Sequence, residues 1–278
     1  MDNNLYWDQQ FSALRLSGEG CKRFLNGQTT VNILKKKEGE IFLACWLSAS
    51  GQVRSLLEIR LEETGAIVIA INGNFDLLYK SFENAIFPSD KVSIDKNIFI
   101  RRLQLISAKP DESHRRITWL EIDQAIPDYL NSYLKASSIE IESWRLKNYL
   151  PISSGEINGE YNPFELGLES LVSLDKGCYL GQELIAKLSR SSSLRRKIMA
   201  WRSDSTLANG VILRNSKEDK LLGNKVGQIT SSAALENSTG SFGLAVVNNK
   251  FLLNNICFDD NLQEIRLFDS VVSFEGWY

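Results

Sequence analysis

The sequence of 278 residues has very little histidine, with a single copy at position 114. A Ser–His–Asp or Cys–His catalytic arrangement needs a histidine that a neighbouring group orients. His114 lies in the charged stretch DESHRRI, which has the composition of a loop, and no acidic residue is placed to orient it. We therefore expect neither a histidine-based triad nor a metal site with His–Cys or His–Glu spacing.

Cysteine is scarce too, and its four copies are scattered. None of Cys21, Cys45, Cys178 and Cys257 forms a Cys-x-x-Cys pair, which argues against a zinc ribbon or a thioredoxin-type motif. Scattered cysteines in a chain of this length fit free thiols in a reducing compartment. Cys21, Cys45 and Cys257 lie in apolar or strand-like segments, so we interpret them as packing residues.

Long apolar runs are missing, since none approaches the roughly 20 residues that a membrane-spanning helix needs. The first residues, MDNNLYWDQQFSAL, lack the basic start and apolar core of a signal peptide. We therefore expect a cytoplasmic protein without a membrane contact. Nucleotide-binding motifs of the GxGxxG and Walker types are absent as well, so nucleotide binding has no motif support.

An excess of positive charge is also missing, because the formal net charge is -2 at pH 7. Any contact with nucleic acid would therefore need a local patch. The densest basic segment is KLSRSSSLRRKIMAW, which spans residues 187–201. It is either a solvated linker or a local site for a carboxylate-rich or phosphate-rich ligand.

The patterns that are present indicate an α+β protein. Residues 40–71 predict three short strands separated by the turns ASGQ and EETG. Residues 75–87 have helical spacing of apolar residues and end at Pro88, and residues 91–108 are strand-like again. Strands followed by a helix and further strands suggest an α+β layer. Residues 128–137 predict another helix.

A helix start is also predicted in YNPFELGLESLVSL. Asn162 is a suitable N-cap, Pro163 suits the first helical position, and Glu165 can complete a capping box. Gly167 is expected to keep this turn short. After Arg196, short apolar runs separated by turn signals predict a small antiparallel barrel or sandwich.

The stretch LDKGCYLGQELIAKL places a cysteine between a glycine and a predicted helix start near Gly181. A helix N-terminus or a nearby cation such as Lys176 lowers the pKa of a thiol and makes it reactive. Gly177 and Gly181 allow a tight turn or close approach of a ligand. The alternative is a small buried cysteine in a turn, with the neighbouring charges capping the helix.

The eight residues 176–183 match the signature Lys-Gly-Cys-Tyr-x-Gly-Gln-Glu. The chain thus resembles the YgfZ family of folate-binding proteins, which are tied to iron–sulfur cluster maintenance and tRNA modification. This family is a sister of the glycine-cleavage aminomethyltransferases. FLNGQTTVNI, LSASGQVRSLLEI, WRLKNYLPISSGEI, NPFELGLESLVSL, GNKVGQITSS and GLAVV are similar to further family segments.

The resemblance implies a three-domain aminomethyltransferase-like fold around a central opening. Residues 1–40 and 140–196 would form an α/β folate-binding domain, and residues 41–139 an inserted ferredoxin-like domain. Residues 197–278 would form a C-terminal antiparallel β-barrel.

The resemblance also implies a site for tetrahydrofolate or a derivative in the central opening, with Cys178 as a candidate reactive thiol at its edge. Glu165 aligns with the glutamate that contacts the pterin in aminomethyltransferases, although it also makes sense as a helix cap. The basic segment would meet the glutamate tail of the folate. The expected cofactor-binding residues are Glu165, Lys176, Gly177, Tyr179, Gly181, Gln182, Glu183, Arg190 and Arg196. No metal site is expected, because one plausible cysteine ligand does not hold an iron–sulfur cluster.

The sequence departs from the aminomethyltransferases at an acidic pair. Where these enzymes have Gly-x-x-Asp-Asp-Leu, this chain has Arg54 and Ser55 in the acidic positions. A guanidinium group cannot replace a carboxylate that activates folate. Asn32, Tyr149 and Ser191 also differ from the usual family residues.

Three functions remain open from the sequence. The first is a folate-binding accessory protein that supports iron–sulfur enzymes or assembly factors. The second is a folate-dependent one-carbon transferase of the aminomethyltransferase class. The third is an accessory protein that contacts tRNA weakly through Arg195, Arg196 and Lys197.

Overall fold

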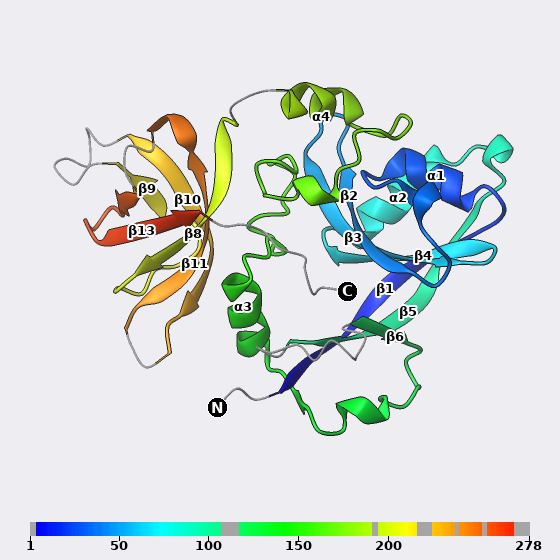
Figure 1. The fold of residues 1–278 in the computed structure, drawn as a ribbon, viewed down its shortest axis with the longest axis horizontal. Helices are drawn as coiled ribbons and strands as arrows, with labels where there is room; N and C mark the ends of the chain where they lie inside the picture. Colours follow the sequence, from blue (N-terminus) through cyan, green and yellow to red (C-terminus); the bar gives the residue numbers. More distant parts are fainter. Residues whose placement is uncertain are drawn as a thin grey trace.

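The computed structural model describes residues 4–106, 117–190, 194–215, 224–236, 239–251 and 255–269. Within these residues it contains a seven-stranded sheet with short helices, and a closed barrel of strands β8 to β13 (Figure 1). The sheet strands are β1 (Leu5–Ser17), β2 (Ile41–Leu47), β3 (Val53–Glu62), β4 (Gly65–Asn72), β5 (Ser93–Leu105), β6 (Ile117–Leu120) and β7 (Leu134–Lys135). The α-helices are α1 (Cys21–Gln28), α2 (Phe75–Ala85), α3 (Ser138–Lys147) and α4 (Gln182–Ser189).

The sheet has the strand order β2-β3-β4-β1-β5-β6, and β7 pairs with β1 in parallel. The predicted strands over residues 40–71 are confirmed as β2, β3 and β4, and the predicted helix over 75–87 is confirmed as α2. β1 lies between β4 and β5, so the expected domain boundary after residue 40 falls inside one hydrogen-bonded sheet. The division of the chain into three domains stays a prediction.

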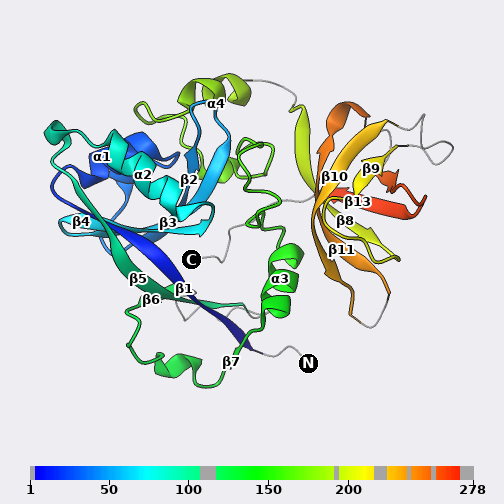
Figure 2. The same cartoon turned by 180° about the vertical axis from the view of Figure 1, so that it is seen from behind.

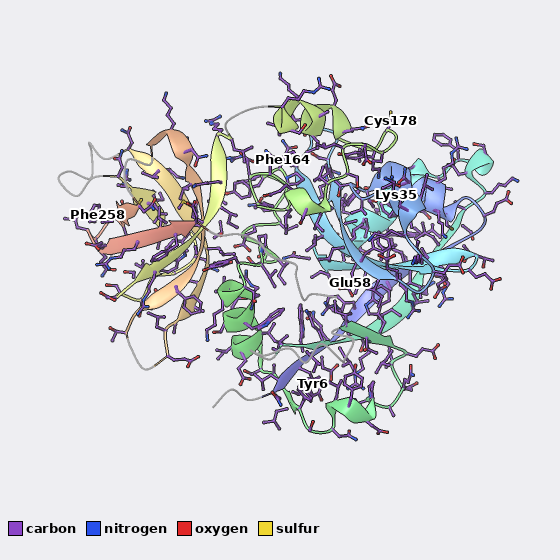
Figure 3. The ribbon with its side chains drawn as sticks, in the orientation of Figure 1. Tyr6, Lys35, Glu58, Phe164, Cys178 and Phe258 are labelled. Atoms are coloured by element: carbon purple, nitrogen blue, oxygen red, sulfur yellow. The ribbon has the colours of Figure 1, made fainter. Side chains whose placement is uncertain are left out.

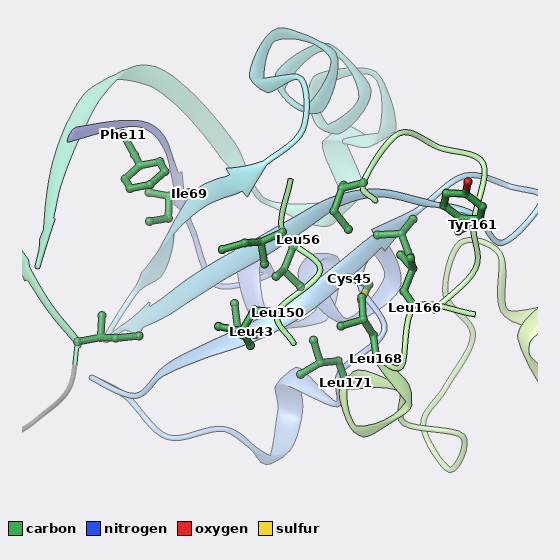
Figure 4. Packing of buried hydrophobic residues seen from close by; sticks show 14 of the residues in the cluster. Phe11, Leu43, Cys45, Leu56, Ile69, Leu150, Tyr161, Leu166, Leu168 and Leu171 are labelled. Atoms are coloured by element: carbon green, nitrogen blue, oxygen red, sulfur yellow. The ribbon is translucent and has the colours of Figure 1, made fainter. Parts of the chain in front are cut away.

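Apolar side chains cover both faces of the sheet because successive residues of a strand point to opposite sides. On β4, Ile67 and Ile69 belong to one core, whereas Ala66 and Val68 belong to the other. Helices α1 and α2 contribute to the second core. The loops over residues 150–171 pack on the first core, where Leu43, Cys45 and Leu56 face Leu150, Leu166, Leu168 and Leu171 (Figure 4).

The helix predicted over residues 128–137 is wrong. This segment forms a short 3₁₀ turn at Asp128–Leu130 and then β7. The backbone amide of Leu134 donates to the carbonyl oxygen of Asn4 at 3.0 Å, and that of Ala136 donates to the carbonyl oxygen of Tyr6 at 2.9 Å. Pairing with the start of β1 therefore outweighs the local helical preference.

The helix start predicted at Asn162 forms only in part. The amide of Asn162 donates to Glu165 Oε2 at 3.1 Å, and the amide of Glu165 donates to Asn162 Oδ1 at 3.0 Å, so the capping box is confirmed. The turn ends at Gly167, whose φ is +69°. The turn does not continue into an α-helix, and the next element is the 3₁₀ turn Glu169–Leu171.

The C-terminal part is the predicted closed antiparallel barrel, with the order β10-β11-β8-β13-β12-β9. Its strands are β8 (Arg196–Ser203), β9 (Ile212–Arg214), β10 (Lys225–Ala234), β11 (Ser241–Asn248), β12 (Ile256–Phe258) and β13 (Glu264–Asp269). Trp201 fills its interior and donates from Nε1 to the carbonyl oxygens of Ser231 and Leu244. No helix of the described segments is long and apolar enough to cross a membrane.

A buried polar network joins the barrel to the sheet part of the molecule. Arg145 of α3 donates from Nη2 to Ser231 Oγ of β10 at 2.6 Å, and this hydroxyl donates to Glu156 Oε1 at 2.6 Å. Arg145, Glu156 and Ser231 are all buried. Nearby, a Cβ added to Gly155 would lie 2.2 Å from the carbonyl oxygen of Thr230. In both views α3 lies between the sheet and the barrel (Figures 1 and 2).

Candidate functional site

The signature segment forms a loop that leads into α4, and its side chains alternate between interior and surface. Lys176 and Tyr179 are buried, whereas Gly177 and Cys178 between them are exposed. Cys178 is a free thiol on the loop that precedes α4 (Figure 3). The alternative of a buried packing cysteine is therefore wrong for Cys178.

Lys176 points into the protein. Its ammonium group donates to the carbonyl oxygens of Thr29 at 2.6 Å and Val31 at 2.7 Å, and it lies 4.8 Å from the centre of the Tyr179 ring. Burial lowers the pKa of Lys176 from 10.5 to about 8. None of its described contacts involves Cys178, so Lys176 anchors the loop to the end of α1.

The other end of the loop is held by Gly181. This residue has a φ of +81° and is the N-cap of α4, which confirms the helix start predicted there. A Cβ at Gly181 would lie 2.6 Å from the carbonyl oxygen of Ser48 in the β2–β3 turn. The amide of Leu180 donates to the carbonyl oxygen of Gly27 at 3.1 Å. The loop is thus clamped between α1 and the β2–β3 turn.

Tyr179 and Gln182 complete the inner side of this loop. Gln182 Oε1 accepts from the amide of Tyr179 at 3.3 Å. Burial, together with the neighbouring Cys45, raises the pKa of Tyr179 to about 12. The Tyr179 hydroxyl is buried and has no hydrogen-bond partner in the described part of the chain.

A second group of predicted residues meets at Glu165 and Arg196. Arg196 Nε donates to Glu165 Oε1 at 2.9 Å, and Arg196 Nη2 donates to Glu165 Oε2 at 3.1 Å. The guanidinium group lies 4.7 Å from the centre of the Tyr161 ring. Burial opposes the charge of Arg196, but the hydrogen bonds that it donates to Glu165, together with the charges of Glu165 and Glu160, outweigh burial and raise the pKa of Arg196. This forked ion pair links the 160s loop to the first barrel strand.

The β2–β3 turn touches both groups. The amide of Val53 donates to the carbonyl oxygen of Tyr161 at 2.8 Å, and a Cβ at Gly51 would lie 3.0 Å from Leu184 Cδ2 of α4. Directly after Val53 come the two positions where the aminomethyltransferases have their acidic pair. Arg54 lies over the Trp46 ring at 5.5 Å, and the Ser55 hydroxyl donates to the carbonyl oxygen of Asn72.

The structure thus places the predicted site residues in two groups. No hydrogen bond or ion pair within the described residues joins the signature loop to the Glu165–Arg196 pair. Glu183 and Arg190 are exposed on α4 and at its C-cap. Tyr161 and the carbonyl groups of Thr29 and Val31 were not predicted. Tyr161 had a visible signal as the aromatic residue that opens YNPFE, whereas nothing local marks the two carbonyl groups.

A cavity elsewhere in the fold lies away from the predicted site residues. A cavity of about 630 Å³ lies between α1 and the 85–91 segment, and none of the predicted site residues lines it. Across the described ranges, no group of three His, Cys, Asp or Glu residues is arranged to hold a metal ion. His114 lies outside the described residues.

Comparison with known proteins identifies the type of fold. No family model matches the chain. The tRNA-modifying protein YgfZ of Buchnera aphidicola is 25% identical over 228 residues, which cover 70% of this chain and 71% of that protein. The aminomethyltransferase T of the glycine cleavage system of Bartonella henselae superposes with a TM-score of 0.78 over 98% of this chain and 86% of that chain, at 15% identity.

The chain is similar to YgfZ proteins and has the aminomethyltransferase fold. A chloroplastic protein of Arabidopsis thaliana, named as a transferase, is 21% identical over 282 residues and covers 86% of this chain. The chain spans 64% of the length of this plant relative. The expected α+β fold with a C-terminal antiparallel barrel, like that of the aminomethyltransferases, is therefore confirmed.

Proposed function

We propose that this YgfZ-like protein binds a tetrahydrofolate and serves as an accessory protein for iron–sulfur enzymes, with Cys178 as its reactive group. One observation carries the proposal: the signature loop holds Cys178 at the surface between buried Lys176 and Tyr179. An exposed thiol between two fixed neighbours is available to a partner or ligand. The cytoplasmic location that we propose is supported by the four free thiols, which fit a reducing compartment.

The residues present fit a folate at Glu165. Its carboxylate already accepts two parallel N–H groups beside the Tyr161 ring, and a pterin has the same kind of planar N–H edge. Arg190, which is exposed at the C-cap of α4, would supply positive charge for the glutamate tail of the folate. When bound, folate is a carrier of one-carbon groups. The chain itself would orient the pterin and present the thiol.

The proposed role in tRNA modification and iron–sulfur maintenance rests on similarity to the YgfZ proteins. Direct tRNA contact would be weak, because two of the three basic residues proposed for it are paired. Arg196 binds Glu165, and Lys197 Nζ donates to Asp269 Oδ1 at 2.6 Å. The partners we propose are therefore folate and iron–sulfur enzymes or assembly factors, with tRNA secondary.

A one-carbon transferase of the aminomethyltransferase class is the alternative that the fold favours. Arg54 and Ser55 count against it, because neither offers a carboxylate. Formation of methylenetetrahydrofolate from an aminomethyl donor by the purified protein would revive this alternative. We expect none.

Calorimetric titration of the full chain with tetrahydrofolate tests the proposal. We expect binding in the micromolar range, weakened about tenfold by Glu165→Gln because a charged acceptor is lost. Glu160→Gln is the matched control, because Glu160 is an exposed residue of the same loop. Absence of binding by the unchanged protein would sink the folate proposal. Binding that Glu165→Gln leaves intact would confine Glu165 to its capping role.

A further inference from the structure

The carboxylate of Glu165 is nearly saturated with hydrogen bonds. Glu165 is 5% exposed, so solvent has little access to it. Oε2 accepts from the amide of Asn162 and from Arg196 Nη2, and Oε1 accepts from Arg196 Nε. An ionised carboxylate offers about four acceptor positions. Only about one is therefore left for a ligand.

Arg196 fills this site as a flat, two-donor group. Its guanidinium group binds the carboxylate through two parallel N–H groups and lies over the aromatic ring of Tyr161. The 2-amino-4-oxo edge of a pterin has a ring N–H and an amino group side by side in one plane. It would need the same two carboxylate oxygens. With about one acceptor position free, the carboxylate cannot hold both groups in this way.

We propose that Arg196 is an internal occupant of the ligand site, which holds Glu165 in the free protein and is displaced when a pterin binds. This inference rests on the proposed function. The exchange replaces one forked pair by another, so ligand binding must first break the ion pair between Arg196 and Glu165.

Displacement also makes Arg196 a determinant of specificity. Arg196 Nη2 donates to the carbonyl oxygen of Glu160 at 2.9 Å in addition to Glu165, so the arginine is held at both partners. A ligand that lacks a two-donor edge forms no forked pair with Glu165, so nothing compensates for the hydrogen bonds of Arg196 that it would break. Tetrahydrofolate therefore binds, whereas p-aminobenzoylglutamate, which lacks the pterin, does not compete for Glu165.

The test is calorimetric titration of full-length variants with tetrahydrofolate and with p-aminobenzoylglutamate. We expect Arg196→Met to bind tetrahydrofolate about tenfold more tightly than the unchanged protein, because no ion pair has to be broken. Arg196→Lys keeps the charge without the fork and is expected to fall between them. Arg202→Met is the matched control, because Arg202 is an exposed arginine on the same strand.

The titrations distinguish failure of the displacement by a pterin from failure of folate binding itself. Tetrahydrofolate binding by the unchanged protein, with equal or weaker binding by well-folded Arg196→Met, overturns displacement and leaves the folate proposal standing. Should Arg196→Met fail to fold in thermal unfolding, Arg196→Lys decides in the same way. Binding of p-aminobenzoylglutamate that Glu165→Gln weakens also overturns displacement. If no protein binds tetrahydrofolate, both proposals fail.

Discussion

The ammonium nitrogen of Lys176 lies 2.6 Å from the carbonyl oxygen of Thr29, a residue 147 positions earlier in the chain. Thr29 is the C-cap of α1, so the cation sits at the end of the helix where the dipole favours positive charge. Because Lys176 is fixed inside, the loop turns outward at Gly177 and Cys178. The exposure of the thiol follows from the burial of its neighbour.

Replacement of Lys176 by Met should change how stability depends on pH. The pKa of Lys176 is lowered from 10.5 in the unfolded chain to about 8 in the folded protein. Between these values the unfolded state binds more protons, so the free energy of unfolding rises with pH. The contribution of Lys176 is about 1.4 kcal/mol per pH unit in the middle of this window.

Urea unfolding of the unchanged protein and of Lys176→Met, repeated between pH 8 and pH 10.5, measures this difference. Other titrating groups cancel in the comparison. Lys187→Met, which removes an exposed lysine of α4, should track the unchanged protein. A difference curve that stays flat with pH would show that the lysine pKa is not lowered by folding.

Cys178 should be the one cysteine that a thiol reagent modifies in the native protein. Cys21, Cys45 and Cys257 are buried, and burial raises the pKa of Cys45 to about 12 and that of Cys257 to about 11. A maleimide at about pH 7.5 should add once to the native chain and not at all to Cys178→Ser. Intact-mass measurement counts the additions. Labelling of a second cysteine at a similar rate would contradict the structure.

Gly181→Ala should destabilise the protein, whereas Gly177→Ala should not. Gly181 has a φ of +81° and faces the carbonyl oxygen of Ser48, so a methyl group there adds strain of about 1–3 kcal/mol. A Cβ at Gly177 would meet no atom within 4 Å. Thermal unfolding of both variants checks this. Equal melting temperatures would mean that the loop can move away from the β2–β3 turn without cost.

Arg145→Met should be strongly destabilising. The substitution leaves the buried carboxylate of Glu156 without its cationic partner, which costs about 3–5 kcal/mol for a buried pair. Lys147→Met, two residues away on α3, breaks an exposed pair with Glu236 and should cost about 0.5 kcal/mol or less. Chemical denaturation gives both values. Similar losses for the two variants would mean that the network contributes no more than a surface pair.

Local chemistry could be predicted from the sequence where cause and effect lie within a few residues. The capping box of Asn162 and Glu165 and the helix start at Gly181 are examples, since each depends on neighbouring backbone groups. The helix predicted over residues 128–137 failed because its competitor, β1, lies far away in the sequence. The local pattern of apolar residues in this segment gives no information about a strand elsewhere in the chain with which it can pair.

The candidate site shows the same limit. The signature motif and the family resemblance singled out Cys178, Lys176, Glu165 and Arg196, and the thiol is indeed exposed. Proximity in sequence suggested that Lys176 serves Cys178, but its partners are backbone carbonyl groups on a remote segment. Likewise Glu165 and Arg196 were selected separately, and only the fold shows that they bind each other.

The network of Arg145, Glu156 and Ser231 bears on how the molecule evolved as much as on how it is built. The barrel supplies a hydroxyl group to two buried charged residues of its neighbour, so their hydrogen bonds are complete only when both parts are folded together. Heating should therefore melt sheet and barrel together in one cooperative transition. Recombination that exchanged the barrel for one without this serine would remove the hydroxyl group that bridges the buried arginine and glutamate, so we expect the two parts to be inherited together.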